Sequence, residues 1–317
     1  MEFLTIVLFL VSLYIGWNIG ANDAANCMGT SVGAGILSYK KAVILVGIFA
    51  LIGAVLQGSG TIGTIGNDIV DVGSMTNLSI VAALLGASLL ITFFTFKGLP
   101  ISTTNVVIGA LVGIGFVTSV SVNWGSVSKI FIAWVFAPIA SAILSYVSYH
   151  FLAHIFANFK LEFIQRRIYL LVIFSGVFLS YFLGANNVGN SMGLAVGSGI
   201  IKPVMAGLLG GIFIAIGSMT FGKNVMKTIG TGITELDSNM AFSAQMGTGL
   251  TVMTLTLLAI PVSTSTAIVG GVAGVGLVKG IATIDKGELF KIVRSWITTP
   301  LLGGVFAVIL FKIFELL

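Results

Sequence analysis

A ten-residue segment with closely spaced Asn and Asp residues occurs twice in this chain, each time directly after a long apolar run. Residues 20–29 read GANDAANCMG, and residues 184–193 read GANNVGNSMG. Carboxylates and carboxamides are costly to bury at membrane depth, so two matched copies indicate a binding site. The fold must therefore bring polar groups from two distant segments into an apolar interior.

The rest of the chain is strongly apolar. Of its 317 residues, 57% are hydrophobic and 8% are charged, whereas soluble domains average about 25% charged residues. Several apolar stretches are shorter than the ~20 residues of a straight membrane crossing. We therefore predict an all-α polytopic membrane protein with about 10–12 transmembrane segments, some of them broken or re-entrant helices. The stretches lie near residues 3–19, 42–57, 78–96, 105–120, 130–153, 168–183, 203–221, 240–260, 266–278 and 297–314.

The duplication extends over the whole chain at offsets of 164, 161 and 162 residues. We predict two homologous membrane repeats, 1–157 and 158–317, joined by the charged segment 158–167. Duplicated membrane halves are typical of secondary transporters, which bind substrate and ions between the repeats near the bilayer midplane. Three pairs illustrate the offsets: Gly53 and Gly217, Pro100 and Pro261, and Trp134 and Trp296.

The Asn/Asp segments offer oxygen ligands of the kind that hard cations such as Na⁺ prefer. The first and last Asn of each copy are four residues apart and share a helix face. The Gly-Ala pair before them allows the helix to break there, which would expose backbone carbonyls as further ligands. Asparagines that only hold helices together are the alternative, but Asp23 favours an ion site because a buried carboxylate needs a proton or a cation. The candidates are Asn22, Asp23, Asn26, Asn186, Asn187 and Asn190.

A second repeated motif, at residues 100–104 and 261–265, places a proline before three hydroxyl residues. Proline interrupts a helix and Ser or Thr caps the next one, so each copy predicts a helix start whose free N–H groups suit an oxyanion. Ordinary kinks in membrane helices are the alternative. Lys97 precedes the first copy, but its counterpart is Leu258, which favours a lysine at the membrane boundary. The candidate residues are Ser102, Thr103, Thr104, Ser263, Thr264 and Ser265.

The remaining sequence features restrict the class of protein. No nucleotide-binding or zinc-protease motif is present, so neither ATP-driven transport nor an enzyme is expected. The net charge of +5 lies in short connections and does not indicate nucleic-acid binding. Cys27 is the single cysteine and excludes an intrachain disulfide. The acidic residues Asp68, Asp71, Glu235 and Asp237 fit either an ion pathway or ordinary loops.

With both motifs in both halves, the chain resembles the inorganic phosphate transporter (PiT) family. The resemblance covers essentially the whole sequence and implies cation-coupled phosphate uptake by a homodimer with inverted repeats, in a prokaryotic inner or plasma membrane. Loop lysines at similar places in both halves would instead favour parallel repeats. One departure is Asn187, where the family commonly has a second aspartate.

The resemblance implies Na⁺ as a co-transported ion, with no other cofactor, and phosphate and the lipid bilayer as partners. The same fold carrying sulfate or a metal–phosphate complex with protons is the nearest alternative, and a passive anion channel is a further one. The implied Na⁺ ligands are Asn22, Asp23, Asn186 and Asn187. The implied phosphate-binding residues are Asn26, Asn190 and the six hydroxyl residues Ser102, Thr103, Thr104, Ser263, Thr264 and Ser265.

Overall fold

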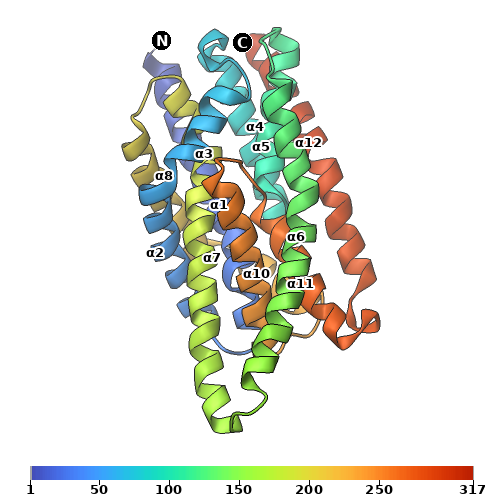
Figure 1. Ribbon diagram of the computed structural model, residues 1–317. Coiled ribbons are helices and arrows are strands. Elements are labelled where there is room, and N and C mark those ends of the chain that lie inside the picture. Colours follow the sequence, from blue (N-terminus) through green and yellow to red (C-terminus); the bar gives the residue numbers. More distant parts are fainter. Residues whose placement is uncertain (1, 317) are drawn as a thin grey trace.

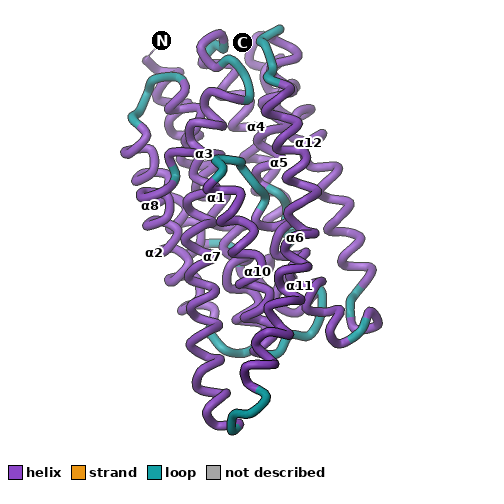
Figure 2. The backbone as a smooth tube through the Cα atoms, in the orientation of Figure 1, coloured by secondary structure: helices purple, strands orange, loops and turns teal. Residues whose placement is uncertain are grey.

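The computed structural model describes residues 2–316, with the side chains at 2, 161–163 and 281 left out of the description. Within this part of the chain, every regular element is a helix, and the only strand-like pairing is an isolated bridge between Val70 and Val122. Figure 2 shows long helices joined by short loops. The predicted all-α fold is confirmed.

The helices form one elongated bundle (Figure 1). The long helices are α1 (Glu2–Gly33), α2 (Tyr39–Gln57), α4 (Asn77–Phe96), α5 (Thr103–Thr118), α6 (Trp124–Phe156), α7 (Leu161–Gly197), α8 (Pro203–Thr220), α10 (Ser238–Leu257), α11 (Thr264–Lys279) and α12 (Lys286–Glu315). The short ones are α3 (Ser59–Gly63), α9 (Lys223–Lys227), the π-helical turns η1 (Thr64–Asp68) and η3 (Thr228–Gly232), and the 3₁₀ turns η2 (Val72–Ser74) and η4 (Ile281–Thr283).

Seven of the described helices are long and apolar enough to cross a membrane: α1, α2, α4, α6, α7, α8 and α12. The shorter apolar helices α5 and α11 each have 16 residues, about 24 Å, which is less than the ~30 Å hydrocarbon core. Helix α10 has 20 residues but carries more polar side chains. The seven candidate spans confirm a polytopic membrane protein, and the count of 10–12 transmembrane segments stays a prediction.

The helices that carry the Asn/Asp segments do not break there. Helix α1 continues to Gly33 and α7 to Gly197, so the interruption that the Gly-Ala pairs would allow does not occur. Small residues in these continuous segments let the neighbouring helices approach closely. After α1 and α7 end, the chain changes direction at Gly35 and Gly199, whose φ angles of +72° and +74° would be strained for other residues.

Apart from the 3₁₀ turns η2 and η4, the order of elements in residues 2–156 recurs in residues 161–315. Helix α1 packs against α8 and α7 against α2, while α5 packs against α12 and α11 against α6. Each half therefore packs mainly on the other half. Figure 1 shows α1 starting at one end of the bundle and α7 at the opposite end. An inverted repeat requires this arrangement; the inversion and the boundary at residue 157 stay predictions.

Candidate functional site

The two Asn/Asp segments and the two hydroxyl motifs meet in the interior of the bundle. The segments lie in the C-terminal halves of α1 and α7, and the hydroxyl motifs lie at the starts of α5 and α11. Every predicted site residue is buried, with at most 2% of its surface exposed. The candidate site is thus a closed polar cluster inside apolar helices.

Asp23 joins the starts of two helices. Its Oδ2 accepts a hydrogen bond from Thr103 Oγ1 at 2.8 Å, and its Oδ1 accepts one from Ser265 Oγ at 3.1 Å. Asn26 Nδ2 donates to the same carboxylate oxygen at 3.3 Å and to Ser265 Oγ at 2.7 Å. Thr103 begins α5 and Ser265 lies in the first turn of α11. One carboxylate therefore connects elements of both halves.

Asn187 occupies the equivalent position on α7. Asn190 Nδ2 donates to Asn187 Oδ1 at 3.1 Å and to Thr104 Oγ1 at 2.8 Å. Thr104 Oγ1 donates to Asn187 Oδ1, and Asn187 Nδ2 donates to Thr264 Oγ1, both at 3.4 Å. These contacts repeat those of Asp23, with an amide in place of the carboxylate. The two halves build one hydrogen-bond pattern with different charge.

Both predicted helix starts are confirmed. Ser102 Oγ caps α5 by accepting the backbone N–H three residues later at 3.1 Å, and Ser263 caps α11 at the same distance. Thr104 Oγ1 lies 3.4 Å from the backbone oxygen of Val262, so the two starts are in direct contact. First-turn N–H groups lack partners within their helix and carry partial positive charge. Two adjoining helix N-termini suit an oxyanion.

Asn22 and Asn186 hold the segments that precede these helix starts. Asn22 Nδ2 donates to Thr95 Oγ1 at 2.9 Å and to Leu99 O at 3.2 Å, and its Oδ1 accepts from Ile101 N at 3.3 Å. Asn186 makes the equivalent bonds at 2.9, 3.3 and 3.0 Å. These bonds use both amide hydrogens of each asparagine. Each side chain thereby fixes the position of the non-helical segment before α5 or α11. The cation-ligand role of Asn22 and Asn186 stays a prediction.

Asn26 and Asn190 each keep one free polar atom. Their Oδ1 atoms are buried and have no hydrogen-bond partner among the described residues. Buried acceptors without partners are costly and rare, so these oxygens indicate a ligand. A carbonyl oxygen fits a cation, or the hydroxyl of a protonated phosphate, better than a bare phosphate oxygen. The phosphate contact expected of these two asparagines stays a prediction.

The sequence matches the model of the phosphate transporter family over residues 19–307. The chain belongs to the phosphate transporter family. Proteins named as candidate phosphate permeases are similar along nearly their whole length. The one from Pyrococcus furiosus is 30% identical, and the match covers 97% of this chain and 95% of that protein. The one from Methanocaldococcus jannaschii is also 30% identical, and the match covers 95% of each chain. A solved structure of a sodium-dependent phosphate transporter is 25% identical and superposes with a TM-score of 0.90, covering 100% of both chains.

With seven apolar helices and archaeal and bacterial relatives, this phosphate transporter family member is an integral protein of a prokaryotic cell membrane. Its interior carries little charge. Among the described side chains, Asp23 is the only buried Asp, Glu, Lys or Arg. Lys97 is exposed, with its Nζ 5.7 Å from the centre of the Phe93 ring, as expected of a boundary lysine.

Two of the four acidic loop residues, Asp71 and Asp237, have local roles. Asp71 Oδ2 accepts a hydrogen bond from Ser74 at 2.5 Å. Asp237 caps α10 and lies 3.5 Å from Lys279 Nζ. These contacts favour the loop interpretation over an ion pathway for Asp71 and Asp237.

The sequence did not identify every polar residue near the site. Thr95 and Thr256, which receive the Asn22 and Asn186 amides, are 161 residues apart, so the repeat offset was a usable signal. Gln245 gave no such signal. It donates to Cys27 O at 3.0 Å and accepts from Ser175 at 2.8 Å, and so connects α10 to α1 and α7.

Proposed function

We propose that this family member is a secondary active symporter that carries inorganic phosphate with Na⁺, both bound between the two halves. The observation that carries the proposal is Asp23, a buried carboxylate bonded to hydroxyls at the starts of α5 and α11. Its described hydrogen-bond partners are neutral, so a cation would supply the missing positive charge. The sodium-dependent phosphate transporter of similar fold supports the same assignment.

Phosphate would bind where the two helix starts adjoin. Backbone N–H groups and the Ser and Thr hydroxyls of both motifs would donate to its oxygens. The arrangement suits a tetrahedral anion because donors approach from two helices rather than one. The phosphate-binding set we propose is Ser102, Thr103, Thr104, Ser263, Thr264 and Ser265, with Asn26 and Asn190 beside it.

Na⁺ would bind on the carboxylate side of the same cluster. Asp23 is its principal ligand, and the free Asn26 and Asn190 oxygens are neutral ligands of the required kind. Each ion makes burial of the other less costly, since opposite charges held together need less hydration. Coupling follows because phosphate without Na⁺ would add a second negative charge beside the Asp23 carboxylate in an apolar interior.

The proposed test is uptake of labelled phosphate into proteoliposomes under an imposed Na⁺ or H⁺ gradient. We expect accumulation driven by Na⁺ and abolished when Na⁺ is equal on both sides. Uptake that ignores Na⁺ and follows the H⁺ gradient would replace this proposal with the proton-coupled alternative. Competition with sulfate in the same assay tests the substrate.

Counterflow separates a carrier from a passive channel. External unlabelled phosphate should accelerate the loss of labelled phosphate from loaded liposomes if a carrier alternates between two sides. If external phosphate does not change the rate at which labelled phosphate is lost, the protein is a pore. The homodimer and the inverted repeat implied by the family resemblance belong to this proposal, and light scattering of the purified protein tests the former.

A further inference from the structure

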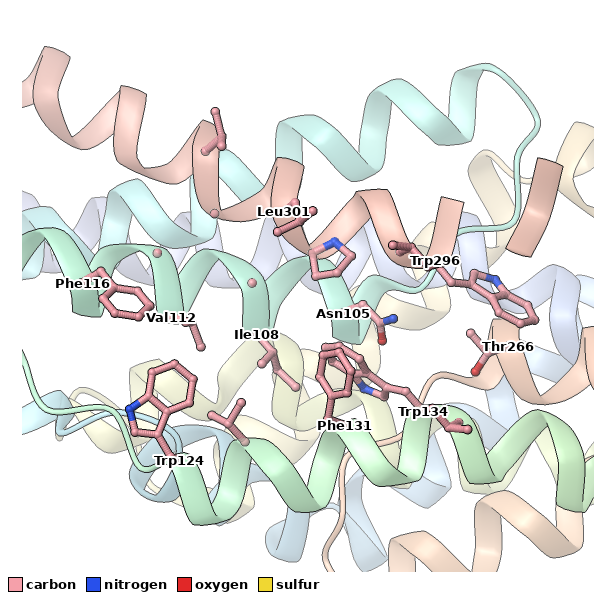
Figure 3. Close-up of a pocket in the computed structure, with 18 of the residues that line it drawn as sticks. Asn105, Ile108, Val112, Phe116, Trp124, Phe131, Trp134, Thr266, Trp296 and Leu301 are labelled. Carbon is pink, nitrogen blue, oxygen red and sulfur yellow. The ribbon is translucent and has the colours of Figure 1, made fainter. Parts of the chain in front are cut away.

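An apolar cavity lies behind the helix starts, outside the candidate ion site. It is formed between α5, α6, α11 and α12 and has a volume of about 1000 Å³. Its described lining includes no Asp, Glu, Lys, Arg or His. Figure 3 shows Phe116 and Trp124 at one end of this cavity, and Asn105, Trp134, Trp296 and Thr266 gathered at the other.

The second end of the cavity holds polar atoms without partners. Asn105 is 1% exposed, and its Oδ1 has no hydrogen-bond partner among the described residues. The indole N–H groups of Trp134 and Trp296 are buried and equally without partners in that part of the chain. Buried polar groups are almost always satisfied in native structures. One acceptor and two donors therefore point to a ligand group that both donates and accepts.

We propose that this cavity binds a single-chain neutral amphiphile of the membrane, with a hydroxyl-bearing head group at Asn105 and its hydrocarbon tail directed toward Phe116. A hydroxyl can donate to Asn105 Oδ1 and accept from an indole N–H at the same time. A charged head group is disfavoured because no described lining residue could balance it.

The walls of the cavity suit a hydrocarbon tail. From Asn105 to Phe116, α5 rises about 16 Å at 1.5 Å per residue, which gives an elongated apolar slot rather than an ion path. Phe131 on α6 and Leu301 on α12 both line it and are 57% and 69% exposed, and both helices are long and apolar enough to cross a membrane. The slot is thus open to the hydrocarbon region from which such a ligand would enter.

A head group at Asn105 would lie beside the starts of both α5 and α11. Asn105 lies in the first turn of α5 and Thr266 in the first turn of α11. The occupant would therefore contact both helices whose starts form the ion site, on the side away from Asp23. The proposal does not depend on which ions the site carries.

Photolabelling of the full-length protein in lipid nanodiscs tests this assignment. The probe is a monoacylglycerol with a diazirine in its chain, and adducts are located by mass spectrometry of peptides. We expect adducts on α5, α6 and α12 that unlabelled monoacylglycerol suppresses several-fold. Val112→Phe, which fills the cavity, should suppress them equally, and Val308→Phe serves if that variant does not fold. Val147→Phe, on the exposed outside of α6, is the matched control and should retain them.

The head-group position needs a second comparison. Asn105→Leu should weaken labelling by the monoacylglycerol probe but not by an alkyl diazirine that lacks a head group. Equal labelling by the monoacylglycerol in wild type and Asn105→Leu would overturn the head-group assignment. Adducts spread evenly over all lipid-facing helices and unaffected by the cavity-filling variants would overturn the cavity itself. Crosslinks between α6 and α12 of two copies, formed by a bifunctional crosslinker in the same nanodiscs while lipid adducts are missing, would show that a second copy covers the cavity and would overturn the lipid assignment.

Discussion

At the scale of single residues, the site is symmetric in shape and asymmetric in charge. Asp23 and Asn187 have equivalent hydroxyl partners, and Asn26 and Asn190 have equivalent free oxygens. One carboxylate therefore serves a cluster built from two similar halves. A negative charge in a water-poor interior interacts strongly with a cation, so this one residue dominates the electrostatics of the site.

Replacement of the carboxylate tests that role. Asp23→Asn should weaken Na⁺ activation of phosphate uptake roughly 10- to 100-fold, because a hydrogen bond or contact to a charged group is worth about 1.5–3 kcal/mol. The measurement is uptake against Na⁺ concentration in proteoliposomes. The double variant Asp23→Asn with Asn187→Asp moves the carboxylate to the equivalent position and should restore part of the activation. Near-normal activation in Asp23→Asn alone would remove Asp23 from its role.

At the scale of elements, continuous helices carry the Asn/Asp segments and short helices supply the anion donors. The first Asn of each copy, Asn22 or Asn186, holds the segment before α5 or α11, and the next residue, Asp23 or Asn187, faces the site. Adjacent side chains on a helix point about 100° apart, which is why these neighbouring residues have different partners. Close helix packing maintains this geometry.

Loss of the Asn22 side chain should weaken phosphate binding without changing coupling. Asn22→Ala removes three hydrogen bonds that hold the segment before α5. Each bond is worth about 1 kcal/mol net, and water or neighbouring groups would replace part of the loss. We therefore expect roughly tenfold weaker phosphate affinity. The Na⁺-to-phosphate ratio should stay the same. Isothermal titration gives the affinity and dual-label uptake gives the ratio. A changed ratio would make Asn22 a cation ligand instead.

Helix contacts at glycine set the stability of the bundle. A Cβ at Gly184 would overlap the backbone oxygen of Ala50, so Gly184→Ala must push α7 away from α2. Overpacking of this kind costs about 1–3 kcal/mol. We expect a lower thermal unfolding midpoint in detergent. Gly63→Ala is the matched control, since a Cβ there meets nothing within 4 Å and the helical backbone accepts Ala, so the midpoint should not fall.

At the scale of the whole molecule, the halves are interlocked rather than side by side. Helices of each half pack mainly on helices of the other, and Asp23 on α1 contacts Ser265 on α11. Neither half holds a complete site. Relative motion of the halves would therefore rearrange the contacts of the proposed ion site that cross between them, such as Asp23 to Ser265, as alternating access requires.

Expression of the chain as two pieces tests this interdependence. Residues 1–157 or 158–317 alone should bind no phosphate, because each lacks half of the donors. Co-expressed pieces should copurify and recover binding, since the large shared apolar interface would hold them together. Scintillation proximity with labelled phosphate measures binding. A single half that binds with native affinity would contradict a site shared between the halves.

The sequence by itself determined the all-helical membrane class, the repeat offsets, the two helix starts and the identity of the polar residues, since hydropathy, proline and capping act locally. Only the tertiary structure decided which residues meet. Sequence spacing did not show that Asp23 contacts Ser265, which is 242 residues away. It also did not show that Asn22 holds the segment before α5 while Asn26 faces the site, or that α1 and α7 are continuous helices. Those outcomes depend on helix packing between the halves, where small residues and buried hydrogen bonds outweigh local preferences.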